Sequence, residues 1–304
     1  MHRGVDLGSA QGVADTAAGS ARIHPDTSMG AVRLTVSDLP RSTEFYENVL
    51  GLSSFTLDDG SVGLRAREGR SLIELHGDAS APPRDPGAPG LFHVAVLMPD
   101  RRELAMALAR VAARRWPLTG ASDHLVSEAL YLSDPDGNGI EIYRDRPRGE
   151  WPERDGQLAM ATLPLDLENL VAELGDSRDV EPSAPPGTRI GHVHLQVSDV
   201  REAEEFYAGV LGFDVTVRGY PGALFVSAGG YHHHLGLNTW NSAGAPPAEV
   251  GGVGLRSFEV VLPSSEEVGR VLERVRAAGI PSEPAAEGVL VRDPFRNEVL
   301  LRTP

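Results

Sequence analysis

The stretch MGAVRLTVSDLPRSTEFYENVLGL, at residues 29–52, decides the fold, because it returns without a gap as IGHVHLQVSDVREAEEFYAGVLGF at residues 190–213. Each copy begins with alternating apolar residues, which predict a half-buried strand. A Ser-Asp pair able to cap a helix follows, then an amphipathic helix that carries Phe-Tyr, and then a glycine that ends it. The chain therefore contains an internal duplication of a strand and a helix.

Fainter repeats extend this duplication to four modules. The strand and helix predicted at 91–111 recur at 255–275, and the turn and last strand DPDGNGIEIYR at 134–144 recur as DPFRNEVLLR at 293–302. Short β-rich runs lie between these segments. We therefore expect an α+β fold of four βαβββ modules, which cover approximately residues 29–80, 91–146, 189–242 and 253–304.

The sequence around the repeats predicts how the modules are joined. Modules one and two make a first domain at 29–146, and modules three and four make a second domain at 189–304. Residues 147–188 are expected to be a linker with a short helix within 163–174, because Pro, Arg and acidic residues flank that apolar segment. Residues 1–28 are expected to be a flexible tail.

Composition excludes several classes of chemistry and of partner. The chain has 304 residues and a formal net charge of −15, which argues against nucleic-acid or anionic-membrane partners. It has no cysteine and no lysine, so thiolate nucleophiles, cysteine-bound metals and Schiff-base chemistry are excluded. Metal ligands must then come from His, Asp or Glu. Because no apolar stretch approaches a membrane span and no signal peptide is recognisable, we expect a soluble, cytoplasmic protein.

The repeat resembles the vicinal oxygen chelate superfamily, which includes glyoxalase I, methylmalonyl-CoA epimerase, bleomycin resistance proteins and type I extradiol dioxygenases. The resemblance implies that pairs of βαβββ modules curl their mixed sheets into cups that hold a divalent metal. In that family the metal ligands lie on the first and last strands of a module. By the repeat alignment these positions, in module order, are Ala31, His93, His192 and Ser257 on the first strands and Glu74, Glu141, Leu235 and Leu300 on the last.

Modules two and three therefore carry the candidate metal ligands, which are His93, Glu141 and His192. Two imidazoles and one carboxylate are the facial triad with which non-haem Fe(II) leaves positions open for substrate and oxygen. We expect Fe(II) as the cofactor, with Mn(II) as the alternative metal, and O2 as the co-substrate. Since these ligands must be unprotonated, binding is expected to weaken below about pH 6.

Two pairings of the modules lead to different sites. If modules two and three share a cup, it holds His93, Glu141 and His192, and the cup of modules one and four binds no metal. If modules one and two share a cup, Glu74 joins His93 and Glu141 in a carboxylate-rich, glyoxalase-like set. The first pairing is the prediction, because it collects the ligands and the acid–base residues in one site.

Two catalytic residues follow from the resemblance to extradiol dioxygenases. The segment EALYLSDPDGNGIEIY, at 128–143, is similar to their signature of a tyrosine, a DPxGN turn and the ligand glutamate, which assigns Tyr131. The ten-residue step to Glu141 places the two residues on adjacent antiparallel strands. His124 matches a histidine that precedes this tyrosine in the family.

A third catalytic residue lies in the histidine run YHHHLGLNTW at 231–240. The run is similar to the family's strand with an acid–base histidine, and period-two alternation places His233 on the face of the ligand position. His232 and His234 point the other way in that register, but a β-bulge would put one of them in its place.

Other polar and aromatic residues are expected to have lesser roles. His194 shares the inward face with His192 and is a candidate substitute ligand. Arg144, Arg146 and Arg148 are expected to form a solvated run with linker contacts, and Asn238 and Trp240 are expected to serve packing.

The resemblance implies an extradiol ring-cleavage dioxygenase similar to catechol 2,3-dioxygenase, with a place in aromatic compound catabolism. Such an enzyme inserts O2 next to the diol of a catechol and forms a 2-hydroxymuconic semialdehyde-type product. The expected partner is a small aromatic diol, and the family habit favours a homo-oligomer. Two alternatives stay open: a glyoxalase- or epimerase-type enzyme with Zn(II), Ni(II) or Co(II), and a metal-free small-molecule-binding protein of the bleomycin-resistance kind.

Overall fold

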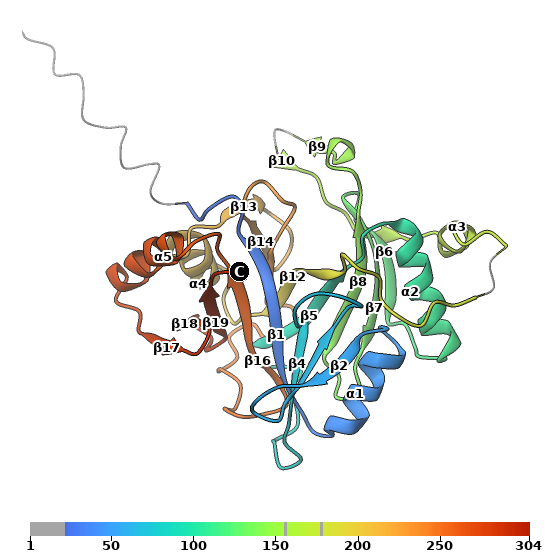
Figure 1. The fold of residues 1–304 in the computed structure, drawn as a ribbon. Coiled ribbons are helices and arrows are strands. Elements are labelled where there is room, and N and C mark those ends of the chain that lie inside the picture. Colours follow the sequence, from blue (N-terminus) through green and yellow to red (C-terminus); the bar gives the residue numbers. More distant parts are fainter. Residues whose placement is uncertain (1–21, 155–156, 177–178) are drawn as a thin grey trace, which may run out of the picture.

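Two curved mixed sheets lie side by side in the computed structural model, which describes residues 22–154, 157–176 and 179–304 (Figure 1). They meet where β1 and β16 of one sheet run beside β12 and β5 of the other. The fold is α+β, as predicted.

The first sheet consists of modules one and four. Its strands pair antiparallel where β1 meets β16, with Val32 opposite Phe258. The strand order is β17 (Ser282–Ala285), β18 (Gly288–Arg292), β19 (Glu298–Arg302), β16 (Gly254–Val261), β1 (Ser28–Val36), β4 (Ile73–Gly77), β3 (Val62–Arg65) and β2 (Ser53–Thr56).

The second sheet consists of modules two and three, which confirms the predicted pairing. They join where β5 meets β12 antiparallel, with His93 opposite His194. Both sheets therefore take strands from each half of the chain, 29–146 and 189–304. The strand order is β11 (Leu163–Pro164), β6 (Gly120–Asp123), β7 (Ser127–Ser133), β8 (Gly139–Asp145), β5 (Gly90–Leu97), β12 (Arg189–Gln196), β15 (Leu235–Asn238), β14 (Ala223–Ser227) and β13 (Asp214–Val217).

The repeated helices begin as predicted, although the second copy continues as a π-helix after Glu204. In both copies the aspartate of the Ser-Asp pair is the N-cap: Asp38 accepts from the Arg41 amide at 3.0 Å, and Asp199 accepts from the Glu202 amide at 3.1 Å. The helical segments are α1 (Leu39–Asn48), α2 (Arg101–Ala113), α3 (Leu167–Ala172), α4 (Val200–Glu204) with its π-helical continuation η2 (Glu205–Val210), α5 (Ser265–Ala277) and the 3-10 turn η1 (Arg148–Glu150).

The Phe-Tyr pair and the Asp-Pro turn recur together because they contact each other. The Tyr46 hydroxyl donates to the buried Asp134 carboxylate at 3.1 Å, and Tyr207 donates to Asp293 at 2.9 Å. Each contact joins the two modules of one half of the chain, although those modules belong to different sheets. The repeat motifs thus connect the two modules of each half through a helix and a turn. The two sheets connect one half to the other.

An ion cluster lies in the cup of the first sheet. The Arg33 guanidinium contacts Glu74 at 2.7 Å and Glu259 at 2.8 Å, and Arg302 contacts Glu259 at 3.1 Å. The half-exposed Glu287 also contacts both arginines, so three carboxylates surround two guanidinium groups. Glu74 is therefore engaged in the first sheet and does not join the histidines of the second.

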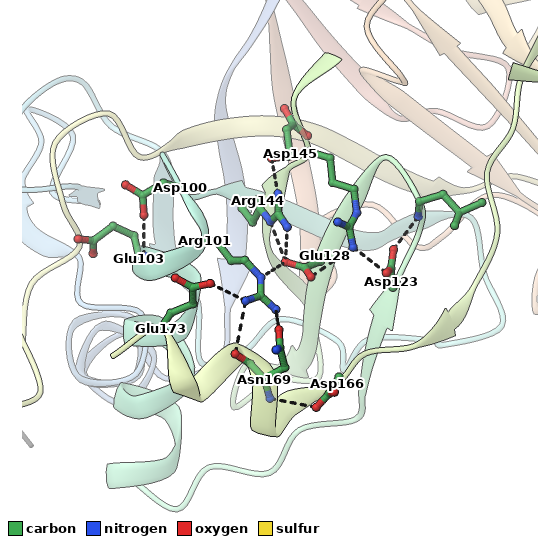
Figure 2. Close-up of polar contacts among 12 residues, drawn as sticks. Asp100, Arg101, Glu103, Asp123, Glu128, Arg144, Asp145, Asp166, Asn169 and Glu173 are labelled. Carbon is green, nitrogen blue, oxygen red and sulfur yellow. Dashed lines mark hydrogen bonds and ion pairs between the residues drawn. The ribbon is translucent and has the colours of Figure 1, made fainter. Parts of the chain in front are cut away.

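A second ion cluster fastens β7 and β8 to the helices outside the second sheet (Figure 2). The buried Glu128 carboxylate accepts from Arg101 at 2.8 Å and from Arg144 at 2.7 Å, and Arg101 also contacts Glu173 at 2.6 Å. Arg144 is only 8% exposed, and Arg146 pairs with Asp123 at 2.7 Å. The prediction of a solvated run is therefore wrong for Arg144, which Glu128 draws inward; Arg146 is half-buried, and Arg148 is exposed as predicted.

The segments outside the repeats contribute to the fold. In the expected linker, β9 (Glu153–Arg154) pairs with β10 (Gln157–Leu158), β11 extends the second sheet, and α3 packs on α2. Most of the expected tail, 1–21, lies outside the described residues, but Ile23 is buried and its amide donates to the Gly212 carbonyl at 2.8 Å. Within the described ranges, no helix combines the length and apolarity that crossing a membrane requires.

Candidate active site

A cavity of about 470 Å³ lies in the cup of the second sheet. Met160, Ala161 and Thr162 of the expected linker close one side of it, a contribution that the sequence did not indicate. Trp240 packs against Phe92 with ring centres 5.3 Å apart, as expected, but it also lines the cavity and is 45% exposed. Aromatic walls of this kind suit a flat, apolar ligand.

Three adjacent strands, β8, β5 and β12, bring Glu141, His93 and His192 together. On β5, Ala95 lies between Glu141 of β8 on one neighbouring strand and His192 of β12 on the other. His93 is two residues before Ala95, so it is on the same face of the sheet. The small side chain of Ala95 leaves room for the two larger ones to approach each other above it. Glu141 Oε2 lies 2.9 Å from His93 Nε2 and 3.1 Å from His192 Nε2.

This group fits a divalent metal. All three residues are at least 94% buried, and their candidate ligand atoms lie within 4.8 Å of one another. His93 Nε2 is buried without a hydrogen bond of acceptable geometry, despite its 2.9 Å distance from Glu141, and His192 Nδ1 also has no partner. A buried His93 Nε2 without a hydrogen bond and a His192 Nε2 beside the same carboxylate oxygen are an arrangement that a shared cation completes. In the part of the chain that the structure describes, no other group of His, Asp and Glu is placed in this way.

The protonation states also suit a metal. Burial raises the pKa of the Glu141 carboxyl, but the imidazoles of His192 and His93 outweigh that effect and hold the pKa well below its usual value. Burial lowers the pKa of His192 to about 4. At neutral pH the group is therefore one carboxylate with a neutral His192, and protons compete at His192 nearer pH 4 than the expected pH 6.

Tyr131 and His124 form a hydrogen-bonded pair at the cavity. His124 Nδ1 lies 2.8 Å from the Ala161 carbonyl, which can only accept, so Nδ1 carries the proton and Nε2 accepts from the Tyr131 hydroxyl at 2.7 Å. Tyr131 lies directly opposite Glu141 on β7 and β8, which confirms the predicted adjacency. Burial, with the charge of Glu141, raises the pKa of Tyr131 well above 10, so the phenol stays neutral.

The three histidines before β15 point in different directions. His233 lines the cavity and its ring centre lies 4.1 Å from that of His192, which is the orientation that the alternation predicts. His232 is fully buried and contacts Asp145, while His234 Nδ1 accepts from the Ala228 amide at 3.1 Å. Burial lowers the pKa of His233 well below its usual value, so its imidazole is neutral at rest.

His194 lines the cavity outside this group. Its ring lies 4.9 Å from that of His93, and its buried Nε2 has no hydrogen-bond partner. The expected substitute ligand is therefore a neighbour of the three candidate ligands and not one of them.

Comparison with known proteins identifies the family. The Glyoxalase/Bleomycin resistance protein/Dioxygenase superfamily profile matches residues 28–142 and 189–301. The chain belongs to this superfamily. Glyoxalase I from Zea mays shares the superfamily fold seen here, with a TM-score of 0.55 and 14% identity over 91% of this chain and 92% of that one. The cppA protein from Streptococcus pneumoniae TIGR4 has a TM-score of 0.55 and 11% identity over 91% of this chain and 99% of that one.

Another protein has a much higher sequence identity to this chain than these two structures. Catechol-2,3-dioxygenase of Bacillus subtilis (strain 168) is 48% identical over 278 residues, which make up 90% of this chain and 95% of that protein. Within the superfamily, such a dioxygenase requires a metal, and a His-His-Glu group able to bind one is present in the second sheet.

Asp145 was not among the predicted site residues, and His232 was predicted only as an alternative to His233. Asp145 follows Glu141 by four residues on β8, so period-two alternation puts both on one face of the strand, and this signal was available. Its contact with the histidine run depends on the path of the loop before β15, which local patterns do not predict.

Proposed function

We propose that this chain is an extradiol ring-cleavage dioxygenase that converts a catechol and O2 into a 2-hydroxymuconic semialdehyde-type product. The observation that carries the proposal is the buried group of His93, Glu141 and His192. Two of its members, His93 and Glu141, line the cavity together with His233 and Tyr131. The 48% identity to a catechol-2,3-dioxygenase supports the same reaction.

Fe(II) is the proposed metal, with Mn(II) as the alternative, held by His93, Glu141 and His192. When bound, such a metal supplies adjacent open positions for catecholate and O2 and passes electrons between them. The reaction balances without an external reductant, because the ring bond beside the diol breaks and both oxygen atoms enter the product.

The protein's own groups bind the ring and move its protons. The aromatic side chains of Phe92, Phe225 and Trp240 give the cavity the shape and polarity for a benzene ring. His233, neutral and facing the cavity, takes the second proton of the diol and later returns it to the oxygen that leaves. The Tyr131 hydroxyl, which donates to His124 in the free protein, turns its proton to the ring oxygen as charge develops there.

The glyoxalase-like alternative required Glu74 as an additional ligand. Glu74 contacts Arg33 at 2.7 Å in the first sheet, so no observation favours that assignment.

The test is to load the purified chain anaerobically with Fe(II), mix it with catechol and air, and record absorbance, oxygen uptake and bound metal. We expect a yellow ring-fission product with one O2 consumed for each catechol. Glu141→Gln removes the carboxylate ligand and should abolish both bound metal and product, while the matched Glu74→Gln should keep both. Bound metal without oxygen uptake across several catechols would favour glyoxalase or epimerase chemistry, and absence of bound metal would favour a small-molecule-binding protein.

A further inference from the structure

A chain of hydrogen bonds leads from His233 away from the cavity to a carboxylate. His233 Nδ1 lies 2.8 Å from His232 Nδ1, and His232 Nε2 lies 2.8 Å from Asp145 Oδ1. His232 is fully buried and His233 is only 6% exposed, so water does not compete for these nitrogens. We infer that Asp145 and His232 are positioning residues that select the tautomer of His233, an assignment that rests on the proposed function of His233.

The direction of each hydrogen bond follows from the Asp145 carboxylate, the last group in this series. An ionised carboxylate can only accept, so His232 Nε2 must be the donor to Asp145. The other nitrogen of a neutral His232, Nδ1, then carries a lone pair and accepts from His233 Nδ1–H. A neutral imidazole has one ring proton, so Nε2 of His233 is left with a lone pair toward the cavity.

Asp145 is itself held by a second set of hydrogen bonds. The Tyr231 hydroxyl lies 2.9 Å from Asp145 Oδ2, and the Tyr143 hydroxyl lies 2.7 Å from that of Tyr231. Burial raises the pKa of both tyrosines well above 10, so each remains a neutral hydroxyl that can donate. The Thr216 hydroxyl donates to the His232 carbonyl at 2.7 Å and holds the backbone of the run. The carboxylate and the ring of His232 are thereby kept in one orientation.

The proton that His233 takes in the proposed function can enter only at Nε2, because Nδ1 is engaged with His232. A lone pair on Nε2 requires the ring proton on His233 Nδ1, which is the order of donors and acceptors that begins at Asp145. This order rests on the proposed role of His233, and nitrogen-15 spectra measure it directly.

This tautomer of His233 suits both the uptake of a proton from the substrate and its later return. The Nε2 lone pair can accept a proton from a substrate hydroxyl without any rearrangement of His233. The resulting imidazolium keeps its Nδ1–H bond to His232, and the Asp145 carboxylate behind it balances the charge. No proton needs to travel along the chain, because Asp145 and His232 act by orientation and charge, as the carboxylate does in a Ser-His-Asp triad.

The first test substitutes Asp145 in the full-length, metal-loaded chain. In Asp145→Asn the amide oxygen can still accept from Tyr231 while the amide nitrogen donates to His232, which would turn both histidines to the opposite tautomer. We expect kcat for catechol to fall roughly 100-fold, within the range for losing an acid–base group, while KM changes less than about threefold and bound metal is unchanged. Glu74→Gln, which removes a carboxylate of similar burial from the first sheet, is the matched control.

Substitutions of His232 separate positioning from a structural role. An asparagine oxygen lies close to the place of a histidine Nδ1 and can accept from His233, so His232→Asn should retain more kcat than His232→Ala. In a protein that already carries His232→Ala, Asp145→Asn should lower kcat little further, because the hydrogen bonds from Asp145 to His233 are already broken. Independent, multiplicative losses from the two substitutions would overturn the inference.

Nitrogen-15 spectra of the histidine side chains give a readout independent of turnover. In the metal-free wild-type protein, His233 should show a protonated Nδ1 and an unprotonated Nε2, and Asp145→Asn should exchange them. A wild-type His233 protonated at Nε2, or an Asp145→Asn enzyme with unchanged kcat, would refute the assignment. Because the spectra do not depend on ring cleavage, failure of the proposed function would leave this measurement standing.

Discussion

The Glu128 cluster makes a quantitative prediction about stability. Glu128 is 3% exposed and receives hydrogen bonds from Arg101 and Arg144 (Figure 2). Glu128→Gln keeps the size of the side chain and removes its charge. Breaking a buried ion pair costs about 3–5 kcal/mol, because the remaining charge is left unpaired.

The structure places this substitution at the lower end of that range. Arg101 keeps Glu173 at 2.6 Å, and Arg146 keeps Asp123 at 2.7 Å. Only Arg144, which is 8% exposed, loses its carboxylate. We therefore expect a loss of about 3 kcal/mol in the free energy of unfolding, which lowers the melting temperature of a chain of this length by about 5 °C.

The pKa of Glu128 determines how the loss of stability in Glu128→Gln depends on pH. Burial raises the pKa of Glu128, but the hydrogen bonds and charges of Arg101 and Arg144 outweigh it, and the net pKa is lowered. A lowered carboxyl pKa contributes stability that is fully present above the unfolded value of about 4.3 and is lost as the pH falls through the folded value. The difference between the two proteins should therefore be constant near neutrality and disappear in acid.

Thermal unfolding followed by circular dichroism between about pH 2 and pH 8 measures both quantities, because the series must extend below the lowered pKa of Glu128. Glu173→Gln is the control, because its side chain is 40% exposed and its pair with Arg101 should be worth less than about 1 kcal/mol. A Glu128→Gln protein that melts within 1 °C of wild type at about pH 7 would refute this reasoning. So would a difference that persists unchanged below the folded pKa.

Three further predictions concern the site. His192→Ala should lose bound metal, as measured by elemental analysis, since only two ligands would remain; an enzyme that keeps its metal and full activity would exclude His192 as a ligand. His233→Ala should keep the metal and lower kcat by about 10²–10⁴, measured by oxygen uptake, because it removes the proton acceptor alone. Dialysis of the metal-loaded protein over a pH series should show retention at pH 6 and release as the pH approaches about 4, the value to which burial lowers the pKa of His192; release centred at pH 6 would contradict the buried, neutral state of this ligand.

The candidate ligands could be read from the sequence because they depend on local periodicity. In a strand, alternate residues share a face, so a repeat that aligns His93 with Ser257 and His192 with Ala31 also predicts which residues face a cup. The turn after Tyr131 places it opposite Glu141 by chain geometry alone. The helix caps and the α+β class follow from the same short-range rules.

Contacts between distant segments were decided only by the tertiary structure. The modules have nearly the same pattern, so local preference does not distinguish the observed pairing of β5 with β12 from a pairing within one half of the chain. The inward turn of Arg144 toward Glu128 and the closure of the cavity by residues 160–162 depend on packing across the sheet.

The hydrogen bonds from Asp145 through His232 to His233 are also contacts that only the tertiary structure decides. Asp145 and His232 are 87 residues apart and meet because β8 and the loop before β15 pack together in one sheet. Alternation along a strand assigns a face to each residue, and so it could identify His233 as the histidine toward the site. It contains no information about which group from another element stands behind that residue, because that depends on long-range packing, which the whole chain determines together.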